Sequence, residues 1–268
     1  MAPEYGRPMA VVAVANQKGG VGKTTVTLGI ADAAARRGLR VLVVDLDPQA
    51  NATSGLGVES PGRTVDDALA EDRSGSMADV VTGSAWPNGS GPSPAVAPSS
   101  PALAAREPQL ATDPIGAQDR LRHALEGVTD AYDLVLLDCP PSLGLLTVNG
   151  LVAADRVLVV TEPAAWASDG VEQMLRTVGR VRELRRPDLE VAAVVVNRLG
   201  RTRDAAYWQG QLEEQFGDLA AGPVRLRAAV AEASAQSLPL SELGSRSGAD
   251  EARGEFDAVL DRILPRPA

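Results

Sequence analysis

The segment Lys18-Gly-Gly-Val-Gly-Lys-Thr-Thr25 constrains the fold of this 268-residue chain more than any other part of the sequence. It holds the only two lysines of the chain, Lys18 and Lys23, whereas arginine is used everywhere else. A lysine ammonium is a compact charge on a flexible stem, which can follow a phosphate oxygen. The glycines between the lysines let successive backbone N–H groups turn inward and form an anion nest. The segment therefore predicts a phosphate-binding loop.

The residues on both sides of this loop have the pattern that a phosphate loop requires, a buried strand before it and a helix after it. Residues 9–15 form a continuous apolar run, which is typical of a strand covered on both faces of a parallel sheet. Residues 24–37 have helical spacing, with an apolar inner face from Leu28 to Ala35 and a C-terminal stop at Gly38. The order of strand, loop and helix indicates a P-loop nucleotide site.

Several residue types in the loop have a chemical role in such a site. Lys23 would reach the β- and γ-phosphates, the Thr24 hydroxyl would coordinate the magnesium between them, and Thr25 would touch the α-phosphate. The loop therefore predicts a nucleotide with β- and γ-phosphates and Mg²⁺ as ligands. The predicted nucleotide-binding residues of the loop are Lys18, Gly19, Gly20, Val21, Gly22, Lys23, Thr24 and Thr25. The usual pattern G-x-x-x-x-G-K-[ST] fails, because position 17 is Gln17 instead of glycine.

With this departure, residues 16–25 resemble the phosphate loop of the deviant Walker-A ATPases, a family that includes the ParA partition proteins and the MinD cell-division regulators. The resemblance implies an ATP-dependent homodimer with an isologous twofold interface. It also implies that Lys18 reaches across this interface to the phosphates bound by the partner subunit. We therefore expect ATP to hold the two subunits together.

Two further apolar runs end in carboxylates and resemble segments of the same family. Within residues 40–53 the resemblance implies that Asp47 orients the attacking water and that Asp45 supports magnesium. Within residues 132–144 the apolar run ends at Asp138, the expected Walker-B carboxylate, which would hold magnesium through water. An aspartate at a strand end is common by itself, so the interpretation depends on the three segments together. The predicted metal site is Thr24, Asp45 and Asp138, and the predicted catalytic residues are Lys18, Lys23 and Asp47.

The rest of the chain continues the alternation of strands and helices. Residues 156–161 and 191–197 are predicted strands, and an amphipathic helix over 169–184 separates them. This pattern is typical of a doubly wound, mostly parallel α/β sheet flanked by helices, here in one domain over residues 1–268. Asn197 stands at the carboxyl end of a strand, where ligands of such sheets bind. A matching asparagine in relatives bonds the adenine, although an asparagine there can also be a simple strand cap.

One segment departs from this alternation. Residues 74–101 are rich in Gly, Pro and Ser, which predicts a flexible loop, poorly ordered to about residue 91. An edge strand and a short helix are expected after it, over residues 95–107. His123 lies in the next predicted helix, residues 118–125, and without a second metal ligand nearby it is expected at the surface.

The composition restricts the class of protein and its compartment. A single cysteine, Cys139, excludes a disulfide framework and favours a reducing compartment. It also excludes the iron protein of nitrogenase, a relative that needs cysteine ligands for its cluster. No apolar run approaches the eighteen or so residues of a membrane span, and the N-terminus lacks a signal-peptide core. We therefore expect a cytoplasmic protein.

The net charge of −9 argues against a generally basic DNA-binding protein, so any DNA contact must be local. Residues 176–227 contain ten arginines against seven acidic residues. Residues 200–203, which include Arg201 and Arg203, resemble a family segment whose arginine helps the ATP-bound dimer hold DNA without sequence preference. Arg225 and Arg227 are a second candidate pair, although they miss the usual family positions by a few residues. The alternative is that these arginines lie on solvated helix faces.

These observations favour an ATPase for chromosome or plasmid partition. It would be weak alone, stimulated by DNA and by a ParB-type centromere-binding protein, and associated with the nucleoid. A MinD-like membrane regulator and a ParA-like ATPase that positions a protein cargo are the alternatives. The tail, residues 251–264, has an apolar stripe (Phe256, Val259, Leu260 and Ile263) but an acidic polar face, whereas anionic lipid requires Lys and Arg there. We expect a core-packing helix, no membrane contact, and the short family form without a helix-turn-helix domain.

Overall fold

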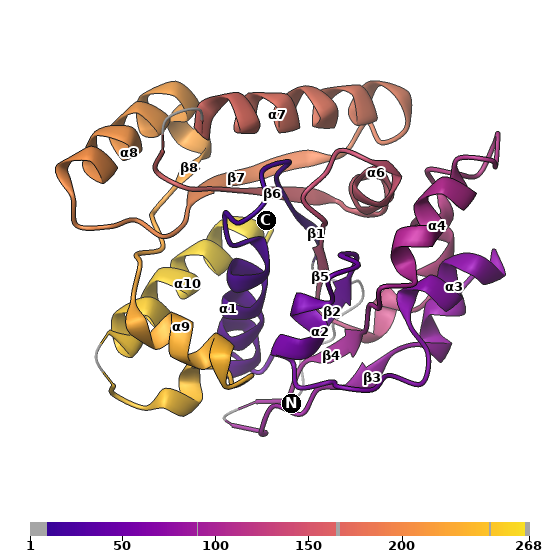
Figure 1. Cartoon of the computed structure of the whole chain (residues 1–268), viewed down its shortest axis with the longest axis horizontal. Helices are drawn as coiled ribbons and strands as arrows, with labels where there is room; N and C mark the ends of the chain where they lie inside the picture. The colour runs from indigo at the N-terminus through magenta and orange to yellow at the C-terminus, as the bar shows by residue number, and fades with distance from the viewer. Residues whose placement is uncertain (1–9, 90, 165–166, 247, 266–268) are drawn as a thin grey trace.

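The fold is known from a computed structural model, which describes residues 10–89, 91–164, 167–246 and 248–265. Its strands are β1 (Ala10–Ala15), β2 (Val41–Asp45), β3 (Thr82–Gly83), β4 (Ala95–Ala97), β5 (Leu134–Asp138), β6 (Arg156–Thr161), β7 (Glu190–Val196) and β8 (Ala220–Ala221). They form one eight-stranded sheet in the order β3-β4-β2-β5-β1-β6-β7-β8 (Figure 1). All neighbouring strands are parallel except β3 and β4, which pair antiparallel.

Helices cover both faces of this sheet. The α-helices are α1 (Lys23–Arg36), α2 (Asn51–Gly55), α3 (Val65–Glu71), α4 (Leu103–Leu110), α5 (Arg120–Ala124), α6 (Leu145–Ala153), α7 (Ala167–Leu184), α8 (Arg203–Phe216), α9 (Ala228–Ala235) and α10 (Ala249–Ile263). Four 3₁₀ turns are also present, η1 (Ser76–Asp79), η2 (Thr129–Ala131), η3 (Gly217–Leu219) and η4 (Leu240–Leu243). The predicted doubly wound, mostly parallel α/β fold is confirmed.

Strand β1 shows how the sheet separates two hydrophobic cores. Successive side chains of a strand point to opposite faces. Val12 and Val14 belong to the core that α1, α9 and α10 cover, whereas Val11 and Ala13 belong to the core under α3, α5, α6 and α7. Because both faces are covered, the strand is apolar at every position, as the sequence predicted. The predicted first strand residue, Met9, lies outside the described residues.

Helix α10 packs in the core, which confirms the prediction for the tail. Its stripe of Phe256, Val259, Leu260 and Ile263 is buried with at most 2% of each residue exposed. The Phe256 ring lies against Gly29 of α1, where an added Cβ would come within 2.4 Å of Phe256 Cε1. None of the helices in the described ranges has the length and hydropathy to cross a membrane.

The Gly/Pro/Ser-rich segment is partly regular. The structure has η1 and β3 within residues 74–83, where Met77 and Val80 are buried, whereas residues 84–89 have no regular secondary structure although Trp86 is buried. Strand β4 and helix α4 follow within residues 95–110, but β3 occupies the sheet edge outside β4. Flexibility of residues 74–101 and the single-domain organisation of residues 1–268 stay predictions.

Candidate active site

The carboxyl ends of β1, β2 and β5 bring the predicted residues together at one edge of the sheet. Asp45 and Asp138 end β2 and β5 and are direct neighbours in the sheet register. The loop of residues 16–22 leaves β1, which lies next to β5 in the sheet, and enters α1 (Figure 1). Parallel strands place all their carboxyl ends on the same side, where ligands of such sheets bind.

The loop has the conformation that its glycines predict. Gly20 and Gly22 have φ angles of +79° and +87°, in the left-handed region that disfavours other residues. Lys23 is only 7% exposed, and its Nζ donates to the Lys18 carbonyl at 3.4 Å. Burial lowers the pKa of Lys23, while the negative charge of Asp138 acts in the opposite direction. The buried Lys23 ammonium inside the glycine loop would therefore favour binding of an anionic ligand.

Asp138 is held by two hydroxyl groups of α1. Thr24 Oγ1 donates to Asp138 Oδ2 at 2.7 Å, and Thr27 Oγ1 donates to Oδ1 at 2.9 Å. Asp138 is 1% exposed, and burial together with the charge of Asp45 raises its pKa to about 7. Sequence reasoning missed Thr27, although its place one turn after Lys23 on the predicted helix was the available signal.

Asp45 organises the loop that follows β2. Its Oδ1 accepts the Asp47 N–H at 3.1 Å, and its Oδ2 accepts the N–H and the hydroxyl of Thr53 at 2.8 and 2.7 Å. Burial raises the pKa of Asp45 to about 6. Asp47 accepts the Gln49 N–H at 2.9 Å and lines the cleft in front of the loop. No sequence pattern pointed to Thr53 as part of the site.

Lys18 lies at the edge of the loop, and its side chain forms an ion pair with a residue of the same chain. Its Nζ forms an ion pair of 2.7 Å with Glu162 Oε1, and its side chain is 43% exposed. Its backbone N–H donates to Asn16 Oδ1 at 3.1 Å, and the Asn16 amide donates to the Val160 carbonyl at 2.7 Å. The loop is thus fixed at the end of β6, while the Lys18 ammonium stays accessible to solvent.

The end of β7 supports the loop from the other side. The Asn197 side-chain amide donates to the Val21 carbonyl at 2.9 Å, and Arg198 Nη1 donates to the Gly20 carbonyl at 2.5 Å. Asn197 is 2% exposed, so its amide is committed to the loop in this structure. Its contact with adenine stays a prediction. Arg198, which sequence reasoning did not include in the site, has a left-handed φ of +55°.

An open cleft of about 450 Å³ lies over the N-terminus of α1. Its volume is within the usual range of small-molecule sites. It is lined by residues of the loop, of α2 and of the segment around α9, namely Gly20, Gly22, Lys23, Thr24, Thr25, Leu28, Asp47, Gln49, Asn51, Ser54, Gly55, Pro141, Arg198, Ser234 and Ser237. Six of the predicted nucleotide-binding, metal-binding and catalytic residues are not part of this lining, namely Lys18, Gly19, Val21, Asp45, Asp138 and Asn197.

The residues present fit magnesium bound together with a phosphate ligand. Within the ranges that the structure describes, no three His, Cys, Asp or Glu side chains converge on a metal position. Nucleotide-bound Mg²⁺ takes only one or two protein ligands, and its other ligands are water and phosphate oxygens. Thr24 and Asp138 supply a hydroxyl and a buried carboxylate 2.7 Å apart at the end of the loop.

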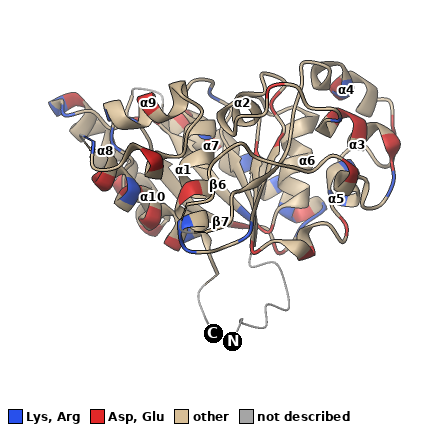
Figure 2. Ribbon diagram, turned by 90° about the horizontal axis from the view of Figure 1, so that it is seen from below, with Lys and Arg blue, Asp and Glu red and all other residues tan. Residues whose placement is uncertain are grey.

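The four candidate DNA-binding arginines fall into two groups. Arg201 and Arg203 are exposed at the start of α8 and make no ion pair with any residue in the described ranges. Arg225 and Arg227 both pair with Glu255 of α10, at 3.1 and 2.7 Å. Figure 2 shows basic and acidic segments mixed along α8 and α10. Only the first pair therefore presents uncompensated positive charge.

Comparisons with known proteins agree with this geometry. A family model described as an AAA domain matches residues 9–191, more than half of the chain. The chromosome-partitioning ATPase Soj of Thermus thermophilus is 41% identical over 208 residues, which cover 77% of each chain. An uncharacterized protein of Mycobacterium tuberculosis is 40% identical over 215 residues, 79% of this chain but only 65% of that protein's length.

Among solved structures, cobyrinic acid a,c-diamide synthase from Mycobacterium smegmatis, with bound ATP analogue and magnesium, superimposes with a TM-score of 0.77 at 30% sequence identity. The superposition covers 96% of this chain and 99% of that one. The match extends beyond the phosphate loop to the whole sheet and its helices. The chain therefore belongs to the AAA-domain family of P-loop ATPases that includes the Soj and ParA chromosome-partitioning proteins.

Proposed function

We propose that the protein is a DNA-segregation ATPase, in which an ATP-bound dimer binds DNA without sequence preference and hydrolysis releases it. The observation that carries this proposal is the convergence of Lys23, Thr24 and Asp47 on one cleft, with Asp138 hydrogen-bonded to Thr24 outside the lining and with the Lys18 side chain 43% exposed. Lys18 pairs with Glu162 outside the lining of its own cleft, and in the proposed dimer its ammonium would leave this pair for the phosphates of the second subunit. The names of the Soj and ParA relatives support the same function.

The side chains of the cleft have separable roles in such a cycle. The backbone N–H groups of the glycine loop would bind the phosphates, with Lys23 beside them. Thr24 and Asp138 would hold magnesium, which would supply positive charge to compensate the phosphate oxygens. Asp47 Oδ2 has no hydrogen-bond partner among the described residues, since only Oδ1 accepts the Gln49 N–H, and it is therefore free to orient water. Catalysis would then depend on positioning the water and compensating phosphate charge.

The DNA contact is assigned to Arg201 and Arg203 rather than to the second pair. Non-specific DNA binding arises from phosphate contacts and counterion release, which require uncompensated positive side chains. Glu255 compensates Arg225 and Arg227, whereas Arg201 and Arg203 are free to contact phosphates. A twofold dimer would present two copies of this pair. We expect weak basal hydrolysis, stimulation by DNA and a ParB-type partner, and association with the nucleoid.

The membrane alternative has less support, because the apolar stripe of α10 is occupied by the core. A cargo-positioning ATPase would use the same dimer and the same arginines, and only its partner would differ.

Amide synthesis is a further candidate, which the Mycobacterium smegmatis relative suggests. A glutamine-dependent amide synthase needs a reactive cysteine thiolate. Cys139 is the only cysteine of the chain, is 1% exposed, and burial raises the pKa of its thiol. It is therefore unsuited to this role.

A comparison of the two arginine pairs tests the DNA proposal. The protein is loaded with ATP and Mg²⁺ in an Asp47→Ala background that prevents turnover, and binding to random duplex DNA is titrated against salt. Arg201→Ala combined with Arg203→Ala removes four charges per dimer, which should reduce the log–log salt slope by up to about 3.6. Arg225→Ala is the matched control and should leave the slope nearly unchanged. Equal losses in both variants would contradict the assignment.

A further inference from the structure

The segment between β3 and β4 has a defined structure that the nucleotide chemistry does not explain. We call residues 84–89 and 91–94 the Trp86 strap. The Ser84 N–H donates to the Pro94 carbonyl at 3.1 Å and closes the strap at its base. The Ser93 hydroxyl donates to the Trp86 carbonyl at 2.7 Å. Trp86 is only 5% exposed, so the strap is anchored by its one large apolar side chain.

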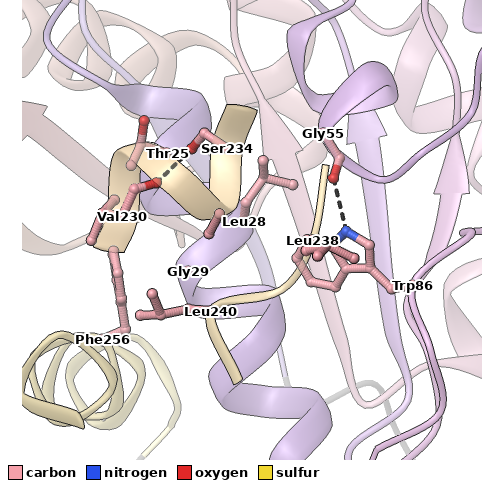
Figure 3. Close-up of a pocket in the computed structure, with 11 residues that line it drawn as sticks. Thr25, Leu28, Gly29, Gly55, Trp86, Val230, Ser234, Leu238, Leu240 and Phe256 are labelled. Carbon is pink, nitrogen blue, oxygen red and sulfur yellow. Dashed lines mark hydrogen bonds between the residues drawn. The ribbon is translucent and has the colours of Figure 1, made fainter. Parts of the chain in front are cut away.

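The strap binds the C-terminal end of α2. Trp86 Nε1 donates to the Gly55 carbonyl at 2.8 Å (Figure 3), and the Ala85 N–H donates to the Leu56 carbonyl at 2.9 Å. The contact is close, because a Cβ added at Gly57 would come within 2.7 Å of the Ala85 Cβ. The end of α2 therefore cannot shift without displacing the strap.

Helix α2 depends on such outside contacts. It has only five residues, and Ala50 before it has a left-handed φ of +54°. So short a helix has too few internal hydrogen bonds to be stable by itself. Its Thr53 donates twice to Asp45, which in turn accepts the Asp47 N–H. The position of α2 thus affects the carboxylate of Asp45, at the end of β2, and through it that of Asp47.

A second contact from the same part of the chain reaches α2. The Ser99 N–H, just after β4, donates to the Thr53 hydroxyl at 2.8 Å. The strap and the end of β4 thus hold α2 at Gly55 and at Thr53. Trp86 also lines a small apolar cavity together with Thr25, Leu28, Gly55 and Ser234, which line the large cleft as well (Figure 3). The Trp86 indole therefore lies beside residues that also line the large cleft.

We propose that Trp86 is a positioning residue for hydrolysis, which acts through α2 to hold Asp45 and Asp47 in place. This inference rests on the proposed ATPase function. The strap would not contact the nucleotide, because Trp86 does not line the large cleft. A defect in the strap should therefore impair the orientation of water by Asp47 and spare nucleotide binding by the loop. The two effects can be separated experimentally.

Trp86→Phe tests the proposal, because it keeps an aromatic ring but removes the N–H donor and leaves the buried Gly55 carbonyl unpaired. We expect kcat for ATP to fall about tenfold, while the Kd of a non-hydrolysable ATP analogue with Mg²⁺ changes less than about twofold. Trp208→Phe is the matched control and should keep the wild-type kcat, since Trp208 lies on α8 in edge contact with Tyr207. A wild-type kcat in Trp86→Phe would overturn the proposal.

A double-mutant cycle with Thr53→Val distinguishes positioning from general destabilisation. If Trp86 acts through α2 on Asp45, the two losses in kcat should be clearly less than multiplicative, whereas independent losses would contradict the proposal. Should Trp86→Phe fail to fold, Ser93→Ala, which removes the hydroxyl that donates to the Trp86 carbonyl, should lower kcat while the Kd of the analogue stays unchanged, and a wild-type kcat in Ser93→Ala would overturn the inference. Absence of ATP hydrolysis by the wild-type protein would instead refute the proposed function itself.

Discussion

Glu162→Gln should strengthen the ATP-dependent dimer. In the single chain, Lys18 is paired with Glu162 at 2.7 Å, with the two side chains 43% and 27% exposed. Because the proposed dimer needs Lys18 at the partner's phosphates, dimerisation must break this pair in each subunit. Glutamine keeps the size of the side chain but removes the charge that holds Lys18 in its own chain.

The size of the effect follows from the exposure of the pair. A partly exposed ion pair contributes about 0.2–1 kcal/mol, because solvent screens it. Two pairs break in a twofold dimer, so the variant should favour the dimer by about 0.4–2 kcal/mol. At about 1.4 kcal/mol per factor of ten, the dimer dissociation constant should fall about 2-fold to 30-fold. The gain in dimer affinity should shrink at high salt, because salt screens the Lys18–Glu162 pair in the wild-type protein and leaves less to be removed.

Sedimentation velocity with ATP and Mg²⁺, in the Asp47→Ala background, measures this constant. Glu172→Gln is the matched control, because Glu172 forms an exposed pair with Arg176 at 3.3 Å on α7, away from the loop. The control should leave dimerisation unchanged. An unchanged or weaker dimer in Glu162→Gln would refute the idea that this pair holds Lys18 back.

Three further outcomes are expected. Gly22→Ala should lower ATP affinity at least about tenfold in a nucleotide titration. The new Cβ would lie 2.1 Å from Asn197 Nδ2, and the φ of +87° at this position disfavours alanine. Gly179→Ala is the control and should keep the wild-type ATP affinity, because a Cβ at Gly179 would have no atom within 4 Å. Phe256→Ala should lower the free energy of unfolding by about 3–5 kcal/mol in denaturant titrations; a membrane-binding helix would instead lose vesicle affinity with little change in stability. Without magnesium and nucleotide, the melting temperature should fall as pH rises from about 4 to about 7, because the pKa of Asp138 is raised from 3.8 to about 7 in the folded protein, so that the unfolded chain loses its proton first and is favoured across this range. Asp138→Asn should flatten this dependence.

The sequence predicted the parts of the fold and site that depend on local pattern. Strands β1, β2 and β5, the glycine loop and helix α1 follow from apolar runs and glycine positions, and their order brings Lys23, Asp45 and Asp138 together. Parallel pairing makes this possible, because it aligns the carboxyl ends of separate strands. Residue type and chain order were therefore sufficient for the core of the site.

The contacts that complete the site are distant in sequence, and no local pattern encodes them. Lys18 and Glu162 are 144 positions apart, and Asn197 and Val21 are 176 apart. Composition around Trp86 predicted a loop, and residues 84–89 and 91–94 have no regular secondary structure, but no local pattern predicted the burial of Trp86 against Gly55. Likewise, the positive charges of Arg225 and Arg227 are compensated by Glu255, which lies near them only because α10 packs against this part of the chain.

The most direct test of the account is the binding of the ATP-loaded Asp47→Ala protein to random duplex DNA and, in parallel, to anionic vesicles. We predict DNA binding that needs ATP, weakens steeply with salt and is absent with ADP, together with no binding to vesicles. Binding to vesicles without DNA binding, or equal DNA binding with ADP and ATP, would contradict the account of an ATP-closed dimer that holds DNA.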